Sequence, residues 1–180
     1  MNYPYRINVS SPLGNILIQG SKTHIQYLKF EPENSPDQSN PPHLPDWNTP
    51  CRQQLVWYFS AAKKFEFDLP IDPQGTEFQQ QVWQALCEVK HGALASYQQI
   101  AIDIGNEKSV RAVATANARN PIALVIPCHR IIGSDKALRG YAGGIDRKAK
   151  LLQLEQHQLS SDINDSLLPT EIDKKTKVLS

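Results

Sequence analysis

The sequence predicts an α+β protein in which an N-terminal β-meander precedes a helical part with a helix-turn-helix. Two observations lead to this fold class. Short segments rich in β-branched and aromatic residues occupy the start of the chain, whereas helical spacing and capping signals dominate after residue 75. We therefore divide the chain into an N-terminal domain (1–74), a C-terminal domain (75–156) and a tail (157–180).

The meander is predicted from three short segments, 5–9, 16–18 and 25–30. Each is rich in the side chains that favour strands, and turn-forming residues around Gly14 and Gly20 separate them. Connections this short join neighbouring antiparallel strands. We therefore expect one small sheet at the start of the chain.

A loop, a helix and a last strand are predicted after the meander. Residues 31–50 contain six prolines and almost no apolar periodicity, which is typical of a surface connection. Residues 52–64 predict a helix, and 65–69 a closing strand. The apolar side chains of this helix that we expect to face the core are Leu55, Val56 and Phe59.

The C-terminal domain opens with a capped helix. Thr76 is a predicted N-cap with Gln79 at the third helical position, and apolar residues then repeat at helical spacing. Trp83 belongs to that apolar stripe, so we interpret it as part of the core rather than as a stacking platform.

Two further helices predict the helix-turn-helix. Ser96 opens the first, which ends at Gly105, and the second covers 108–119. The spacing of Ala101 and Gly105 lets two helices cross tightly, although it also fits an ordinary helix pair in a helical core. A helix-turn-helix places its second helix against a DNA groove. We expect its inner face to hold Val110, Val113 and Ala114, and its exposed face to hold small residues, Ala112, Thr115, Ala116 and Ala118.

The pentapeptide Ile-Pro-Cys-His-Arg at 126–130 is the strongest chemical signal. A thiol with an ordinary pKa of about 8.5 is mostly protonated at neutral pH, and adjacent basic groups raise its thiolate fraction. His129 and Arg130 supply such groups to Cys128. The alternative interpretation is a small buried cysteine without chemistry, which we assign to Cys51 and Cys87.

Composition limits the possible environments and partners. The formal net charge is +1, but residues 76–155 carry a net +3, which suits weak, salt-sensitive DNA binding. The sequence has no apolar run long enough to span a membrane and no signal peptide, and three cysteines without paired spacing argue against disulfides. We expect a cytoplasmic protein. Neither C-x-x-C nor H-x-x-x-H occurs, so we expect no metal and no cofactor.

The segments around the pentapeptide extend the signal into a family resemblance. An apolar run bounded by prolines, 120–127, precedes Cys128, and a glycine-punctuated loop, 140–144, follows it. From about Gly75 to Glu155 the chain resembles the O6-alkylguanine-DNA alkyltransferases, also called methylated-DNA–protein-cysteine methyltransferases. The resemblance implies a ribonuclease H-like N-terminal domain and a monomeric protein that acts on double-stranded DNA.

The activity that the resemblance implies is DNA repair by direct reversal. The alkyl group of O6-alkylguanine, with O4-alkylthymine as a second candidate substrate, moves irreversibly to Cys128, so each molecule works once. His129 receives the thiol proton through a water molecule, and Glu155 orients and stabilises the imidazole. Asn120 is the hinge that ties the helix-turn-helix to the cysteine segment.

The remaining site residues follow from the same resemblance. Arg111 is the finger that fills the stack when the damaged base is flipped out, and Tyr97 crowds the target phosphate. The carbonyls of Cys128 and Ile131 accept from the guanine amino group, and the Ala142 amide donates to O6. The other expected substrate or DNA contacts are Arg130, Tyr141 and Gly143.

Two other functions fit parts of the sequence. A cysteine hydrolase needs an oxyanion hole, and the residues around Cys128 match no cysteine-peptidase signature. A non-enzymatic helix-turn-helix sensor or regulator of DNA lesions resembles the same family but lacks the cysteine. The presence of Cys128 therefore favours a transferase over both alternatives.

Overall fold

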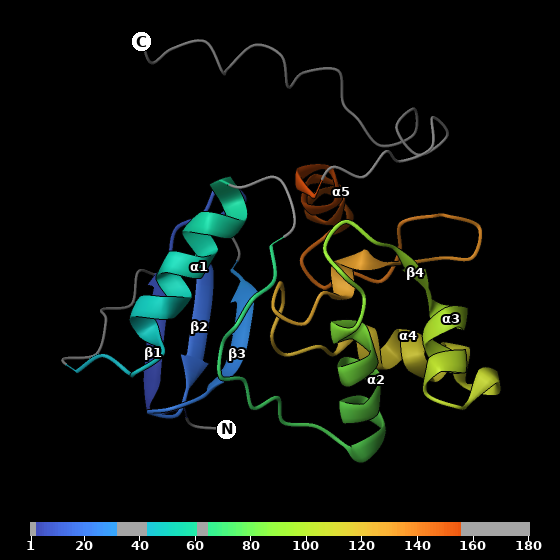
Figure 1. Ribbon diagram of the computed structural model, residues 1–180, viewed down its shortest axis with the longest axis horizontal. Helices are drawn as coiled ribbons and strands as arrows, with labels where there is room; N and C mark the ends of the chain where they lie inside the picture. The colour runs from blue at the N-terminus through green and yellow to red at the C-terminus, as the bar shows by residue number, and fades with distance from the viewer. Residues whose placement is uncertain (1–2, 32–42, 61–64, 156–180) are drawn as a thin grey trace, which may run out of the picture.

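The computed structural model describes residues 3–31, 43–60 and 65–155. Strands β1 (Tyr5–Val9), β2 (Ile16–Gly20) and β3 (Ile25–Phe30) form an antiparallel sheet in that order, which confirms the predicted meander. Apolar side chains of all three strands are buried, and helix α1 (Asn48–Ser60) lies across one face of the sheet (Figure 1). The predicted tail lies outside the described residues.

Helix α1 begins earlier than predicted and turns a different side inward. Its buried side chains are spaced for one helical face, at Cys51, Leu55 and Tyr58. Val56 falls off this face and is 64% exposed, so its predicted core position is wrong. The neighbouring Trp57 is also exposed. Residues 61–64 of the predicted helix lie outside the described part of the chain.

The strand predicted at 65–69 does not form. The backbone N–H and carbonyl of Asp68 bond to the side chain of Gln54 on α1, at 2.8 and 2.7 Å, instead of to a neighbouring strand. Pairing with the sheet occurs later, where Ile25 donates to the Pro70 carbonyl and accepts from the Asp72 amide, each at 2.8 Å. The segment is therefore an extended connection beside β3.

The capped helix and the helix-turn-helix form as predicted. Thr76 and Gln79 make a reciprocal capping box at the start of α2 (Glu77–Cys87). Helix α3 (Tyr97–Asp103) is capped by Ile104, and the predicted end residue, Gly105, follows with a φ of +71°. A short 3-10 turn, η1 (Glu107–Ser109), leads into α4 (Val110–Ala118), and α3 and α4 pack together.

Two residues of these helices lie differently from their predicted positions. Ala116 is buried rather than exposed, because α4 packs against α2, and its carbonyl accepts the indole N–H of the buried Trp83 at 2.9 Å. Ala112, Thr115 and Ala118 are exposed as expected. Cys87 is exposed at the end of α2 rather than packed in the core, whereas Cys51 is fully buried.

The segment that carries Cys128 joins the two parts of the fold. Ile122 bridges to Leu28 of β3, with backbone hydrogen bonds of 2.9 and 2.7 Å on either side. The chain then forms the 3-10 turn η2 (Cys128–Arg130) and strand β5 (Ile131–Ile132), which pairs in parallel with β4 (Ala95–Ser96). One apolar core extends from the sheet through α1 to α2 and α4.

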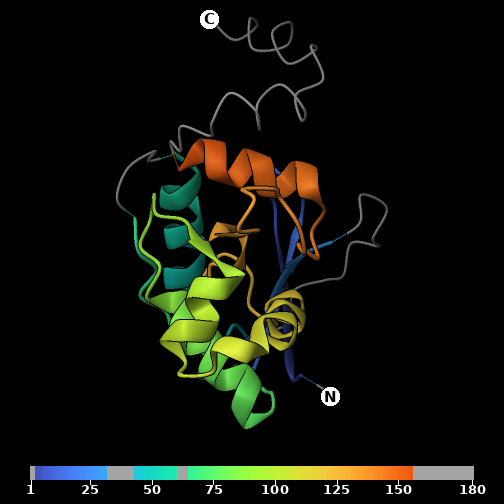
Figure 2. The ribbon, with the colours of Figure 1, turned by 90° about the vertical axis from the view of Figure 1, so that its right-hand side faces the viewer.

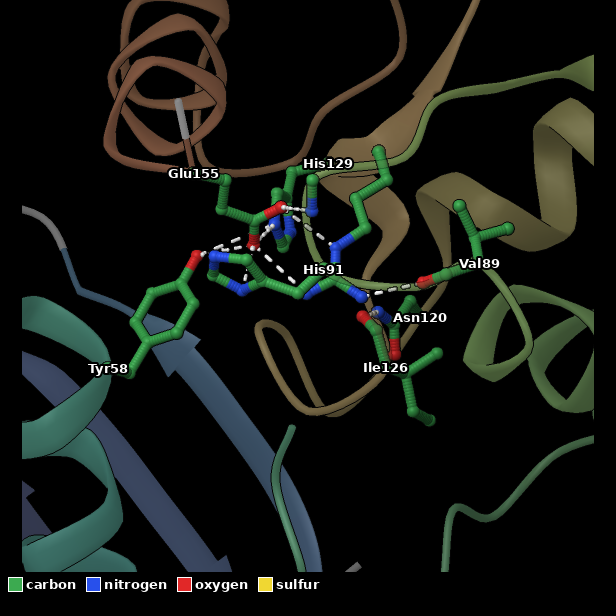
Figure 3. A network of polar contacts seen from close by, with 9 residues as sticks. Tyr58, Val89, His91, Asn120, Ile126, His129 and Glu155 are labelled. Atoms are coloured by element: carbon green, nitrogen blue, oxygen red, sulfur yellow. Dashed lines mark hydrogen bonds and ion pairs between the residues drawn. The ribbon is translucent and has the colours of Figure 1, made fainter. Parts of the chain in front are cut away.

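The last described helix, α5 (Ile145–Leu154), crosses one end of the protein (Figure 2). Glu155 caps its C-terminus and points back toward the cysteine segment (Figure 3). Within the described residues no helix is both long and apolar enough to cross a membrane.

Candidate active site

Cys128 begins the 3-10 turn η2 directly after Pro127 and is 5% exposed. It borders a narrow pocket of about 40 Å³, which is also lined by Lys29, Asn120, Ala123, Tyr141, Ala142 and Gly143. Burial raises the pKa of the Cys128 thiol, and a hydrogen bond from Asn120 and the charge of Lys148 oppose this effect. The thiol is therefore protonated at rest, and forming the thiolate requires a base.

Asn120 braces the loop that delivers the cysteine. Its amide donates to the Ile126 carbonyl at 2.8 Å, and its side-chain oxygen accepts from the Ile122 amide at 2.9 Å. Between these two anchors Leu124 adopts a φ of +70°, a conformation that is costly for a residue with a Cβ. The two bonds of Asn120 hold this strained loop closed, and its role as a hinge to the helix-turn-helix stays a prediction.

Glu155 is the centre of a buried polar network that includes His129, the residue after Cys128 (Figure 3). Its Oε1 accepts from Tyr58 Oη at 3.0 Å and lies 2.9 Å from His129 Nε2. Arg130 donates through Nε to Oε2 at 2.9 Å and through Nη2 to Oε1 at 3.0 Å. The Gly92 amide donates to Oε2 at 3.4 Å.

This network keeps Glu155 ionised. Burial raises the pKa of the carboxyl group, but the hydrogen bonds and charges of His129 and Arg130 outweigh burial and hold the pKa well below its usual range. An ionised carboxylate only accepts hydrogen bonds, so the neutral His129 carries its proton on Nε2. Its Nδ1, which bonds to no described residue, is then the basic nitrogen.

The pKa of His129 itself is lowered. Burial of the fully enclosed ring favours the neutral imidazole, and the hydrogen bond and charge of Glu155 oppose burial. A neutral imidazole backed by a carboxylate is the arrangement that accepts a proton and then stabilises the resulting imidazolium.

The structure brings three more side chains to the site that sequence reasoning missed. Lys148 of α5 is fully buried, and its Nζ donates to the carbonyls of Ile131 and Arg139 at 2.5 and 2.6 Å. Burial lowers the Lys148 pKa to about 8. Tyr58 and His91 lie beside Glu155. A lysine among the other charged residues of a helix gives no sequence signal for burial, and neither does a histidine in a turn.

Arg130 belongs to the Glu155 network and does not line the cysteine pocket. Its side chain is buried, and its donors bond to Glu155 and, at 2.6 Å, to the Val89 carbonyl. The 3-10 turn explains this position, because three successive residues of such a turn point in different directions. Arg130 is therefore a partner of Glu155, and its contact with substrate or DNA stays a prediction.

The other predicted residues fall into two groups. Tyr141, Ala142 and Gly143 line the cysteine pocket, and Ile131 follows η2 with its carbonyl bonded to Lys148. Tyr97 and Arg111 lie outside this pocket lining. Tyr97 is buried and donates to the Arg139 carbonyl at 3.0 Å, and burial raises its pKa to about 12. Arg111 is exposed on α4.

The fold and the site define the class of protein, because a helix-turn-helix that shares a pocket with a buried cysteine, followed in the chain by a histidine bound to a carboxylate, is typical of a DNA-binding protein with thiol chemistry. Two family models match the chain: 6-O-methylguanine DNA methyltransferase, ribonuclease-like domain, over 5–73, and 6-O-methylguanine DNA methyltransferase, DNA binding domain, over 77–157. The chain belongs to the 6-O-methylguanine DNA methyltransferase family.

Individual relatives agree with this assignment. The methylated-DNA–protein-cysteine methyltransferase of Methanosarcina barkeri is 43% identical over 158 residues, which cover 84% of this chain and 96% of that protein. The methylated-DNA–protein-cysteine methyltransferase of Haemophilus influenzae is 40% identical over 149 residues, which cover 81% of this chain and 83% of that protein. The crystal structure of Mycobacterium tuberculosis OGT in complex with DNA has a TM-score of 0.74 at 39% identity, covering 86% of this chain and 94% of that one.

Proposed function

We propose that this protein repairs DNA by direct reversal of alkylation. The Sγ thiolate of Cys128 attacks the alkyl carbon of O6-alkylguanine and forms an S–C bond. The O6–C bond breaks with its electron pair on O6, and the guanine anion leaves and takes up one proton, which balances the proton lost by the thiol. The observation that carries the proposal is that the pocket cysteine is followed in the chain by His129, whose Nε2 lies 2.9 Å from Oε1 of the buried Glu155. The thioether product has no low-energy route back to the thiol, so each molecule acts once.

Different site residues accept the proton, stabilise charge and line the pocket. Nδ1 of His129 receives the thiol proton through a bridging water, and Glu155 stabilises the imidazolium that forms. The Lys148 ammonium lowers the pKa of the buried thiol and so favours the thiolate. Tyr141, Ala142 and Gly143 line the space that the flipped base enters, and the amide of Ala142 is the proposed donor to O6.

DNA reaches the site through the helix-turn-helix. The exposed face of α4 carries Arg111 among small residues, Ala112, Thr115 and Ala118. Small side chains allow close approach without reading base edges, and a guanidinium can take the place of the flipped base in the stack. We assign DNA binding and transfer to 75–156 and a supporting role to 1–74.

The finer assignments complete the proposal. The substrate is double-stranded DNA that contains O6-alkylguanine, with O4-alkylthymine as a second substrate, and the protein acts as a cytoplasmic monomer without a cofactor. A monomer suits a site whose reacting thiol and proton relay, Cys128, His129 and Glu155, come from one chain.

Intact-mass measurement tests the proposed function. After mixing with a duplex that contains O6-methylguanine, the protein should gain the mass of one methyl group, and peptide mapping should place it on Cys128. A lesion sensor would bind the duplex and gain no mass. A hydrolase would turn over instead of stopping after one event, so the stoichiometry separates all three functions.

A further inference from the structure

His91 is a buried histidine beside the proposed proton relay. It lies in the turn after α2, its side chain is 4% exposed, and its Nδ1 is 3.7 Å from Glu155 Oε1. Neither ring nitrogen has a hydrogen-bond partner among the described residues. A buried imidazole without such partners is costly, so its position beside a carboxylate needs a physical explanation.

The backbone of the turn holds His91 in this position. Ala93 donates to the Lys90 carbonyl at 2.9 Å and closes the turn, and Gly92 has a φ of +80°, which a residue with a Cβ rarely adopts. The Gly92 amide then donates to Glu155 Oε2 at 3.4 Å. The turn is thus bound to the Glu155 carboxylate through Oε2, and this places the His91 side chain beside Oε1 of the same carboxylate (Figure 3).

The groups that face His91 come from three packed elements. From α1, the ring of Tyr58 meets it edge to face with centroids 6.1 Å apart. The end of α5 contributes Glu155, and η2 contributes His129 and Arg130, which bind the same carboxylate. The nearest charge on its own turn, Lys90, is exposed and paired with Glu66 at 3.4 Å. Glu155 is therefore the negative group that His91 shares with His129.

We propose that His91 is a positioning residue that draws on the Glu155 carboxylate and thereby lowers the proton affinity of His129. Both protonation states of His91 act in this direction. A neutral His91 turns an N–H dipole toward Oε1 and weakens its pull on the proton of His129, whereas a charged His91 also repels the imidazolium. Limiting that affinity keeps His129 free to accept a proton from the thiol.

This inference rests on the proposed function for its meaning, but its test does not need DNA. The titration of His129 is followed by NMR of the imidazole nitrogens and carbons in the free protein, in the wild type and in His91→Phe. The phenyl ring fills the space and removes both nitrogens. We expect the pKa of His129 to shift upward in the variant. In His91→Gln, which retains a donor, it should stay nearer to the wild-type value.

A control and a second measurement make the test decisive. His24 is exposed on the turn before β3, so His24→Phe should leave the His129 titration unchanged. An unchanged titration in His91→Phe would overturn the proposal. If that variant does not fold, the wild-type protein still decides, because coupled imidazoles must each sense the other's titration and independent curves refute the coupling.

The two proposals fail in different ways. If no methyl group reaches Cys128, the transferase function is wrong, although His91 and His129 can still be coupled through Glu155. If transfer occurs and the titrations are independent, only the role of His91 is wrong. A pH–rate profile for O6-benzylguanine links the two, since the acid limb should move upward in His91→Phe along with the pKa of His129.

Discussion

Arg130 binds Glu155 through two hydrogen bonds, from Nε to Oε2 at 2.9 Å and from Nη2 to Oε1 at 3.0 Å. The pairing places a permanent positive charge on the carboxylate that also receives His129. It connects the residue two positions after the cysteine to the end of α5, 25 residues further along the chain. The cysteine segment and the last described helix are therefore joined through one buried ion pair.

The first prediction concerns the stability that this pair provides. Arg130→Ala leaves the Glu155 charge buried with fewer partners, and breaking a buried pair in this way costs roughly 3 kcal/mol of unfolding free energy. Urea unfolding measures the loss. Arg119→Ala, at an exposed arginine after α4, serves as the control and should change stability by no more than about 0.5 kcal/mol. A loss as small as that of the control would contradict the proposed role of the pair.

The second prediction tests the nucleophile. Cys128→Ser should bind a duplex with O6-methylguanine yet transfer nothing, because a hydroxyl at neutral pH is a far weaker nucleophile than a thiolate. Binding is measured by fluorescence anisotropy and transfer by intact mass. Cys87→Ser is the matched control, since that thiol is exposed at the end of α2 and should be dispensable. Single-turnover transfer by Cys128→Ser would remove Cys128 from the mechanism.

The third prediction separates base extrusion from bond exchange. Arg111 is exposed on α4, so Arg111→Ala should lose much more activity on duplex DNA than on the free base O6-benzylguanine. Rates of Cys128 modification with the two substrates provide the comparison. Lys108→Ala, at an exposed cation in η1, should weaken DNA binding without this contrast. Equal losses on both substrates would assign Arg111 to a different role.

Local sequence signals predicted much of the fold. The Thr76–Gln79 capping box and the Ser96 cap both form, because their partners are only three residues apart. The buried face of α1 was harder to predict from the sequence. Val56 and Tyr58 are both apolar enough for a core, and packing against β1–β3 decides which of them is buried. The strand predicted at 65–69 does not form, because the Gln54 side chain of α1 makes the hydrogen bonds to the Asp68 backbone that a neighbouring strand would make.

The site residues also differ in whether they could be predicted from the sequence. Cys128 was accessible because its basic neighbours lie within the motif, whereas the roles of Asn120 and Glu155 were assigned only through family resemblance. Tyr58 is separated from Glu155 by 97 residues, and Gly92 by 63, so no periodicity connects them. The burial of Lys148 depends on two distant backbone carbonyls for which the sequence has no signal.

The fourth prediction concerns acid stability. The pKa values of Glu155 and His129 are both below their ordinary values in the folded protein, so the unfolded chain binds more protons as the pH falls. The Glu155 contribution is fully present above the unfolded pKa of about 4.3, and that of His129 above about 6.5. Unfolding free energy should therefore fall from pH 7 to pH 3.

Urea unfolding at several pH values checks this dependence. Glu155→Gln should be less stable than the wild type at pH 7 but should lose less stability below about pH 4.3, because the titrating carboxylate is gone. Glu66→Gln, at an exposed carboxylate paired with Lys90, should follow the wild-type curve. Parallel curves for Glu155→Gln and the wild type would show that Glu155 contributes no pH-dependent stability.

The last prediction concerns the catalytic role of Glu155. Glu155→Gln keeps a polar group of the same size beside His129 but removes the negative charge, so the imidazolium loses its stabilising partner. Proton transfer from Cys128 should become harder, which raises the apparent thiol pKa and slows transfer. The pH dependence of Cys128 alkylation by a small electrophile measures this effect directly, again with Glu66→Gln as the control. If the profiles of Glu155→Gln and the wild type superimpose while the variant is folded, Glu155 is only a structural anchor and His129 acts alone. An upward shift with retained folding instead separates the electrostatic role of the carboxylate from its role in packing α5 against the cysteine segment.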